Sequence, residues 1–228
     1  MKKDRKGAYM LSTNIKRIID ITLGDGYLGY GKVSKHAHYS CGHSTNQRDY
    51  LLHKMSILLN LGYKTTEYVY EKSCSIYTAN HQDFSTAHKW IYNKSRKFID
   101  NALLRNCDAE TLAYWFMDDG GADKTNKLRY KDKLYVYESP KTKSYSLYTN
   151  CFSYDENVLI TLWLKEKFNI TANIYINKGP YIRISDIPSK DSLRNTIEPY
   201  IISCMRYKIK TPHSFDNIAY SVVCNSRD

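Results

Sequence analysis

Two predicted helices that each end in Asp-Gly restrict the fold of this chain more than any other feature of its sequence. The runs "IIDITLGDG" (18–26) and "LAYWFMDDG" (112–120) both carry apolar residues at helical spacing. Because Asp and Gly are common turn formers, either run alone is compatible with an exposed helix end followed by a turn. The aspartates before the final glycines, Asp25 and Asp119, lie 94 residues apart (119 − 25). The segments that follow them test whether this offset marks an internal repeat.

After the first motif, an extended polar stretch to about Tyr39 precedes a helix that Ser44 opens, with Gln47 as its capping-box partner. A hairpin follows in "TEYVYEKSCSIYTA", and a further helix is predicted from about Phe84 to Tyr92. The first half therefore reads as helix, strands, helix, hairpin and helix.

After the second motif, the strands "KLYVYES" and "SYSLYTN" precede a helix that Ser153 opens, with Glu156 in the same capping-box role. The hairpin "ANIYINKGPYIRIS" and a helix from about Ser189 to Tyr200 follow. Each half ends in a basic segment, in which Lys97 and Lys208 stand just before an apolar residue. The shared order predicts an α+β fold made of two αββαββα units.

The second hairpin separates an apolar face from a polar face. Its isoleucines, at 174, 176, 182 and 184, alternate with other residue types and are expected to pack on helices. The opposite face carries aromatic, amide and guanidinium groups of the kind that read base edges and bind phosphates: Tyr175, Asn177, Tyr181, Arg183 and Ser185. A solvated sheet face is also polar, so the alternation by itself leaves a purely structural role open.

The charge of the chain indicates a polyanionic partner. It has 34 Lys and Arg against 23 Asp and Glu, a net charge of +11 and a pI of about 9.2. Nucleic acid is the first candidate and a membrane surface the second. No segment approaches the roughly 20 apolar residues of a spanning helix, and the start "MKKDRKGAYMLSTN" lacks the apolar core of a signal peptide. A basic intracellular protein is therefore expected, in an organelle such as the mitochondrion or in the cytoplasm of a bacterium or of a phage-infected cell.

The six cysteines form no CxxC pair, which argues against a disulfide framework and a cysteine-rich zinc site. One segment, "HAHYSCGH", contains His36, His38, Cys41 and His43. On a strand, His36 and His38 point to the same face, where they can contact phosphate or bases as readily as zinc. DNA contact is the expectation for His36 and His38, and the role of the four-residue cluster stays open.

The paired motifs and the order of elements resemble the LAGLIDADG homing endonucleases. The second half, with "LAYWFMDDGG", "KFNITANIYINKGPYIRIS" and "MRYK", resembles the monomeric omega-intron-encoded type in particular. The resemblance covers most of residues 12–212. It implies two pseudo-symmetric αββαββα units, 12–107 and 108–212, that form a saddle with curved antiparallel sheets on its DNA face. Residues 1–11 are then a basic N-terminal arm, and residues 213–228 a C-terminal tail.

In this family the two motif helices pack side by side, and each delivers one carboxylate to the centre of the saddle. The resemblance identifies Asp25 and Asp119 as catalytic metal ligands, with the backbone carbonyls of Gly24 and Asp118 completing the shell. Mg²⁺ is the expected cofactor, and Mn²⁺ is expected to substitute for it, because both suit hard oxygen ligands. Since Asp118 corresponds to Gly24, its side chain is not expected to be an essential ligand.

Lys97 and Lys208 match the family's pocket lysines, one per active site, which order the attacking water and stabilise charge on the phosphate. The helix contact usually needs small residues. Ala113 and Gly24 meet this need, whereas Asp20, Tyr114 and Trp115 are bulkier than the usual pattern.

The function implied is a metal-dependent staggered double-strand break in a long, asymmetric DNA target, made by a monomer with no membrane partner. The alternative is an RNA-splicing maturase with intron RNA as its partner, or a non-cleaving DNA-binding protein, on the same fold. The sequence leaves the DNA target undefined.

Overall fold

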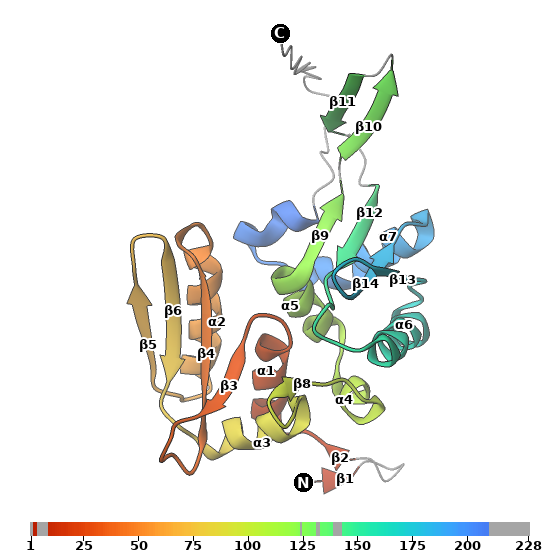
Figure 1. Cartoon of the computed structure of the whole chain (residues 1–228). Helices are drawn as coiled ribbons and strands as arrows, with labels where there is room; N and C mark the ends of the chain where they lie inside the picture. The colour runs from red at the N-terminus through yellow and green to blue at the C-terminus, as the bar shows by residue number, and fades with distance from the viewer. Residues whose placement is uncertain (1, 4–8, 124, 131–132, 139–142, 210–228) are drawn as a thin grey trace.

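Two four-stranded antiparallel sheets form the framework of the molecule (Figure 1). The computed structural model describes residues 2–3, 9–123, 125–130, 133–138 and 143–209. Most of the expected N-terminal arm and the whole C-terminal tail lie outside these residues, as does Cys224. Figure 1 labels the elements used below.

The first half contains one sheet with strand order β3-β4-β6-β5. Its elements are the small strands β1 (Lys2–Lys3) and β2 (Tyr9–Met10), then α1 (Thr13–Thr22), β3 (Tyr27–Tyr30), β4 (Ala37–Ser44), η1 (Thr45–Gln47), α2 (Arg48–Asn60), β5 (Thr65–Val69), β6 (Ser73–Thr78), α3 (Gln82–Ile91), β7 (Tyr92–Asn93), β8 (Arg96–Lys97) and α4 (Asn101–Asn106).

The second half contains a sheet with strand order β9-β12-β14-β13. Its elements are α5 (Ala109–Asp119), β9 (Gly120–Asp123), β10 (Thr125–Tyr130), β11 (Lys133–Glu138), β12 (Ser144–Leu147), α6 (Tyr154–Phe168), β13 (Asn173–Ile176), β14 (Pro180–Ile184), α7 (Ile187–Ile197), η2 (Glu198–Tyr200) and η3 (Ser203–Lys208).

The two sheets have the same topology. If strands are counted from each motif helix and the β10–β11 hairpin is set aside, both sheets run in the order first, second, fourth, third. Each motif therefore begins one copy of a structural repeat. The predicted α+β class with antiparallel sheets is confirmed. Figure 1 shows α1 and α5 beside each other between the two sheets.

Two predicted details are wrong, one in each half of the chain. Lys133–Glu138 of "KLYVYES" forms β11, which among the described residues pairs with β10 alone, and the strand after the second motif is β9. β9 begins at Gly120, directly after α5 ends at Asp119, and it takes the place beside β12 in the sheet. β10 and β11 pair with each other in a separate hairpin. Ser44 makes no side-chain cap, because a 3₁₀ turn separates it from α2. The predicted capping box of Ser153 and Glu156 is present at the start of α6.

The predicted faces of the second hairpin are correct near the core and wrong at its tip. Ile182 and Ile184 are buried, whereas Ile176 is 75% exposed. Ile176 pairs with Pro180 at the turn, where the hairpin extends past the helix that covers the sheet. Alternation fixes which side a residue faces, but tertiary packing decides how far along the hairpin that side is covered.

Candidate active site

The two motif helices present their C-terminal ends at one place. Ser12 caps α1 by accepting from the backbone N–H of Ile15 at 3.4 Å, and Asp108 and Thr111 form a capping box on α5. α1 ends at Thr22, so Asp25 follows the helix, whereas α5 extends to Asp119 itself. A helix C-terminus carries partial negative charge, which favours a cation at both positions.

The ends of the motifs touch. A Cβ added to Gly24 would overlap the side chain of Asp118, so only glycine permits this approach. The backbone N–H of Asp25 donates to Oδ2 of Asp118 at 3.0 Å. Burial, followed by the charges of Asp25 and Asp118, raises the pKa of Asp119 to about 7, against the opposing effect of two lysines. Three carboxylates thus lie close enough to repel one another.

The lysines predicted at the ends of the two halves both reach the motif ends. Nζ of Lys97 donates to the carbonyl oxygens of Thr22 at 2.6 Å and of Gly24. Nζ of Lys208 donates to the carbonyl oxygen of Asp118 at 2.7 Å. Burial lowers the pKa of both lysines, and the carboxylates around them oppose this shift. Each half therefore brings one ammonium group to the end of its own motif helix.

The donor set fits a hard divalent cation. It consists of the carboxylates of Asp25 and Asp119 and the carbonyls of Gly24 and Asp118, which are all oxygen donors of the kind that Mg²⁺ and Mn²⁺ bind. A carbonyl oxygen has two lone pairs, so those of Gly24 and Asp118 can each bind a lysine and a second partner. The burial of Asp119 and the neighbouring carboxylates of Asp25 and Asp118 raise its pKa, and a cation at this position would offset both effects.

Of the His and Cys residues of "HAHYSCGH", Cys41 and His43 lie together, with 3.5 Å between Sγ and Nε2, whereas His36 and His38 lie apart from them. Along β4, Cys41 is buried and His38 alternates to the opposite, partly exposed face, while His36 precedes the strand. The imidazole of His43 is 5% exposed, and its Nδ1 lies 3.8 Å from Oδ2 of Asp25. Among the described residues, the group of metal-binding type is Asp25, His43 and Asp118, with ligand atoms within 4.8 Å of one another.

Sequence reasoning missed the partners of the Asp118 side chain. Nζ of Lys54 lies 2.7 and 2.9 Å from its two carboxylate oxygens, and both side chains have zero exposure. The Tyr50 hydroxyl donates to Oδ1 of Asp118 at 2.7 Å. Lys54 occupies the buried stripe of α2 with Tyr50, Leu51 and Leu58. A lysine at an apolar position of a helix was the available signal, since lysine is rarely buried unless it is paired.

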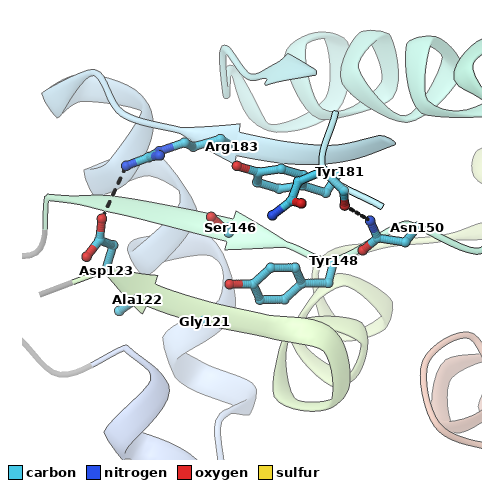
Figure 2. Close-up of a pocket in the computed structure, with 9 residues that line it drawn as sticks. Gly121, Ala122, Asp123, Ser146, Tyr148, Asn150, Tyr181 and Arg183 are labelled. Atoms are coloured by element: carbon cyan, nitrogen blue, oxygen red, sulfur yellow. Dashed lines mark hydrogen bonds and ion pairs between the residues drawn. The ribbon is translucent and has the colours of Figure 1, made fainter. Parts of the chain in front are cut away.

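A polar hollow of about 370 Å³ lies on the second sheet (Figure 2). Four of the five predicted sheet residues are on this face, and Asn177, Tyr181 and Arg183 line the hollow. The Arg183 guanidinium donates through Nε to Ser144 at 2.9 Å and through Nη2 to Asp123 at 3.2 Å. Tyr181 stacks on Tyr148 with ring centroids 5.8 Å apart. These contacts hold planar and hydrogen-bonding groups at the surface.

Tyr175, the fourth, lies under the Arg183 guanidinium, with 5.8 Å between Cζ and the ring centroid. Ser185, the fifth, is exposed just beyond the end of β14. Tyr175, Asn177, Tyr181 and Arg183 therefore share one polar face at the hollow, and Ser185 lies beyond its end.

The first sheet has a matching aromatic face that the sequence prediction did not include. Tyr27, Tyr68 and Tyr77 are each about half exposed, at 53%, 47% and 45%. Tyr77 contacts Tyr68 edge to face with centroids 5.6 Å apart, and lies 6.4 Å from His38. Strict alternation in "SCSIYT", with Cys74 and Ile76 buried, was the signal for this face.

The contact between the two motif helices accommodates a bulky acid. Asp20 has no exposure, and it accepts from the Thr111 hydroxyl at 2.6 Å and from Nζ of Lys16 at 2.9 and 3.0 Å. Ala113 is also fully buried at the helix contact. Asp20 is therefore tolerated between the helices because polar partners from both helices satisfy it.

Comparisons with known proteins agree with this geometry. The profile of the LAGLIDADG DNA endonuclease family matches residues 17–190. A protein named probable intron-encoded endonuclease 1, from Wickerhamomyces canadensis, is 35% identical over 135 residues, which cover 58% of this chain and 53% of that protein. The cytochrome b mRNA maturase bI2 of Saccharomyces cerevisiae is 26% identical over 220 residues, covering 87% of this chain and 48% of the maturase. The chain thus spans about half the length of both relatives.

Among solved structures, the homing endonuclease I-WcaI bound to its DNA recognition sequence superposes with a TM-score of 0.69, at 27% identity over 90% of each chain. No helix among the described residues is long and apolar enough to cross a membrane. The duplicated αββαββα framework, the touching motif ends and the family match over residues 17–190 together show that this chain belongs to the LAGLIDADG DNA endonuclease family.

Proposed function

We propose that the protein is a site-specific DNA endonuclease that hydrolyses one phosphodiester bond in each strand of a long, asymmetric target. The observation that carries this proposal is the meeting of two acidic motif ends with one half-buried lysine each, Lys97 and Lys208. Two quasi-equivalent sites are what a double-strand break requires. Residues 12–107 and 108–212 are the proposed halves, and the fact that both sit in one chain favours a monomer acting on an asymmetric site.

In the proposed mechanism, Asp25 and Asp119 hold divalent cations, with the carbonyls of Gly24 and Asp118 as further ligands. When bound, the cations supply an acidified water and a counter-charge for the phosphate and the leaving oxygen. Lys97 and Lys208 add ammonium groups beside these positions, where they orient water and stabilise negative charge on the phosphate. Mg²⁺ is the proposed physiological ion, and Mn²⁺ the substitute. The crystal structure of a more distant protein of this fold, I-DmoI, contains DNA and Mn.

We propose that the polar faces of the two sheets contact the DNA. Arg183 suits base recognition, because Ser144 and Asp123 fix its orientation and leave further N–H groups of the guanidinium to face a guanine edge. Tyr175, Asn177, Tyr181 and Ser185 complete this surface in the second half. His38 on the face of the first sheet, with His36 just before it, is the corresponding proposal for the first half.

The test is selection of cleaved sites from a randomised duplex library by the purified protein in Mg²⁺ or Mn²⁺. Asp25→Asn and Asp119→Asn are each expected to reduce cleavage by at least about a thousandfold, because loss of one carboxylate removes a metal ligand. DNA affinity, measured by gel shift, should stay within about threefold, since the sheets supply the phosphate contacts. If either variant cuts at the rate of the unaltered protein, the assignment of that aspartate is wrong.

A maturase is the second candidate, because similarity to the yeast cytochrome b mRNA maturase extends over 87% of this chain. Under that hypothesis the protein would bind intron RNA and assist its splicing. Recovery of no cut duplex in either metal, together with tight intron RNA binding, would favour the maturase over the endonuclease.

A further inference from the structure

We propose that the buried Lys54–Asp118 ion pair positions the main chain of Asp25. The pair thereby prearranges the active site that contains Asp25, whereas the site that contains Asp119 has no equivalent ion pair among the described residues. This inference rests on the proposed endonuclease function. It assigns Lys54, Tyr50 and the Asp118 side chain as positioning residues that act through Asp25.

The Asp118 carboxylate has hydrogen-bond partners on both oxygens. Its Oδ1 accepts from Lys54 at 2.7 Å and from the Tyr50 hydroxyl at 2.7 Å. Its Oδ2 accepts from Lys54 at 2.9 Å and from the backbone N–H of Asp25 at 3.0 Å. Because the Lys54 and Asp118 side chains have no solvent exposure, neither ion can exchange its partner for water. The carboxylate is therefore held in one orientation.

The backbone N–H of Asp25 needs a hydrogen-bond acceptor from outside α1. α1 ends at Thr22, so the N–H of Asp25 lies beyond the helical hydrogen bonds. The Asp25 side chain is 42% exposed, so side-chain packing does little to fix it. The Oδ2 of Asp118, which comes from the other half of the molecule, supplies the acceptor. Lys54, on α2, fixes that acceptor from the side of the first half.

The main chain at Asp119, in the other active site, is held in a different way. Asp119 is the last residue of α5, and the N–H of the following Gly120 bonds to the carbonyl of Phe116, so helix geometry holds this segment. The counterpart of Asp118 is Gly24, which has no side chain to reach Asp119. Lys54 is the seventh residue of α2, and the seventh residue of α6 is Ile160, which carries no charge.

The test compares two variants that both remove the buried charges. Lys54→Met with Asp118→Ala deletes the acceptor for Asp25. Lys54→Met with Asp118→Asn keeps an amide oxygen that can accept from the Asp25 N–H, and places an NH2 group where the Tyr50 hydroxyl can accept from it. Removing both ions together avoids an unpaired buried charge, which would disrupt folding for an unrelated reason. The assay follows each strand of a target duplex separately, with DNA affinity in Ca²⁺ and thermal unfolding measured beside it.

With the alanine variant, cleavage of one strand should slow by at least about tenfold while the other stays within about threefold, because misplacing a reacting group lowers the rate of its own site. Nicked duplex should therefore accumulate. The asparagine variant should recover most of the lost rate. Equal slowing of both strands, or equal rates for the two variants, would overturn the proposal. Failure of the unaltered protein to cut any duplex would instead refute the endonuclease function itself.

A measurement on the unaltered protein keeps the proposal falsifiable even if the variants do not fold. Amide hydrogen exchange at Asp25 should be protected by at least about a hundredfold relative to an open chain, although this residue is exposed and outside a helix. An unprotected Asp25 amide would show that the Asp118 carboxylate does not hold the main chain.

Discussion

The three acidic side chains at the motif ends differ in what surrounds them. Asp25 is the most exposed, Asp118 is neutralised by Lys54, and Asp119 is enclosed without a direct ion pair among the described residues. Burial and the charges of Asp25 and Asp118 raise the pKa of Asp119 to about 7. A metal ligand must be deprotonated, so a divalent cation and a proton compete for Asp119.

We therefore predict that Mn²⁺ or Mg²⁺ raises the melting temperature more at about pH 8 than at about pH 6. An Asp in an unfolded chain has a pKa of about 3.9. Because the folded value is higher, the protein without metal loses stability as the pH rises from the unfolded pKa of about 3.9 to the folded pKa of about 7. A bound cation offsets that loss. Thermal unfolding with and without chelator measures it, and in the Asp119→Asn control the pH dependence of the metal effect should shrink. An equal metal effect at both pH values would contradict this prediction.

At the scale of the elements, α6 joins the two halves through its first turn. The Glu156 carboxylate accepts from the backbone N–H groups of Ser153 at 2.7 Å and Ile99 at 2.9 Å, and from Arg96 at 2.7 and 3.2 Å. Burial would raise the pKa of Glu156, but these hydrogen bonds outweigh it and lower the pKa to about 2. The capping box was predictable from four consecutive residues. Its link to β8 was not, because Arg96 and Ile99 lie in the other half of the sequence.

We predict that Glu156→Gln lowers the free energy of unfolding by about 1–2 kcal/mol at neutral pH, because it weakens a set of charge-assisted hydrogen bonds. A depressed folded pKa means that this contribution is complete above the unfolded value of about 4.3 and is lost as the pH falls towards 2. The stability gap between the two proteins should therefore close with acid. Urea unfolding at about pH 7 and pH 3 measures the gap. Ser153→Thr, which keeps a cap hydroxyl, is the matched control, and a gap independent of pH would refute this account.

At the scale of the whole molecule, the repeat places two polar sheet faces and two motif ends in one chain with a net charge of +11. Phosphate contacts supply affinity in proportion to the cations released from DNA, whereas base contacts supply the preference for one sequence. The second sheet contains groups for both kinds of contact. Its Arg183, which suits base contact, is already oriented by Ser144 and Asp123. Most lysines of the chain, which suit phosphate contact, lie outside this sheet.

We predict that raising salt from about 50 to 200 mM weakens DNA binding by about a thousandfold or more, as expected for six or more phosphate contacts. Arg183→Ala should relax the preference for guanine at one position of the selected target, and it should change the slope of log affinity against log salt by no more than about one. Binding titrations on selected and substituted duplexes measure both quantities. A loss of affinity that is uniform across sequences would mean that Arg183 contacts phosphate.

The sequence by itself determined the repeat, the α+β class, the motif helices and the lysines that reach their ends. These features depend on local periodicity and on residues near each motif glycine, which are readable along the chain. The tertiary structure alone decided that β9, and not "KLYVYES", enters the second sheet, and that His43 faces Asp25 while His38 faces outward. It also decided that Asp118 pairs with Lys54, a residue 64 positions away in the other half. The physical reason is that a buried charge pairs with the group of opposite charge that tertiary packing places beside it. Contacts between the two halves of the chain leave no periodic pattern in the sequence.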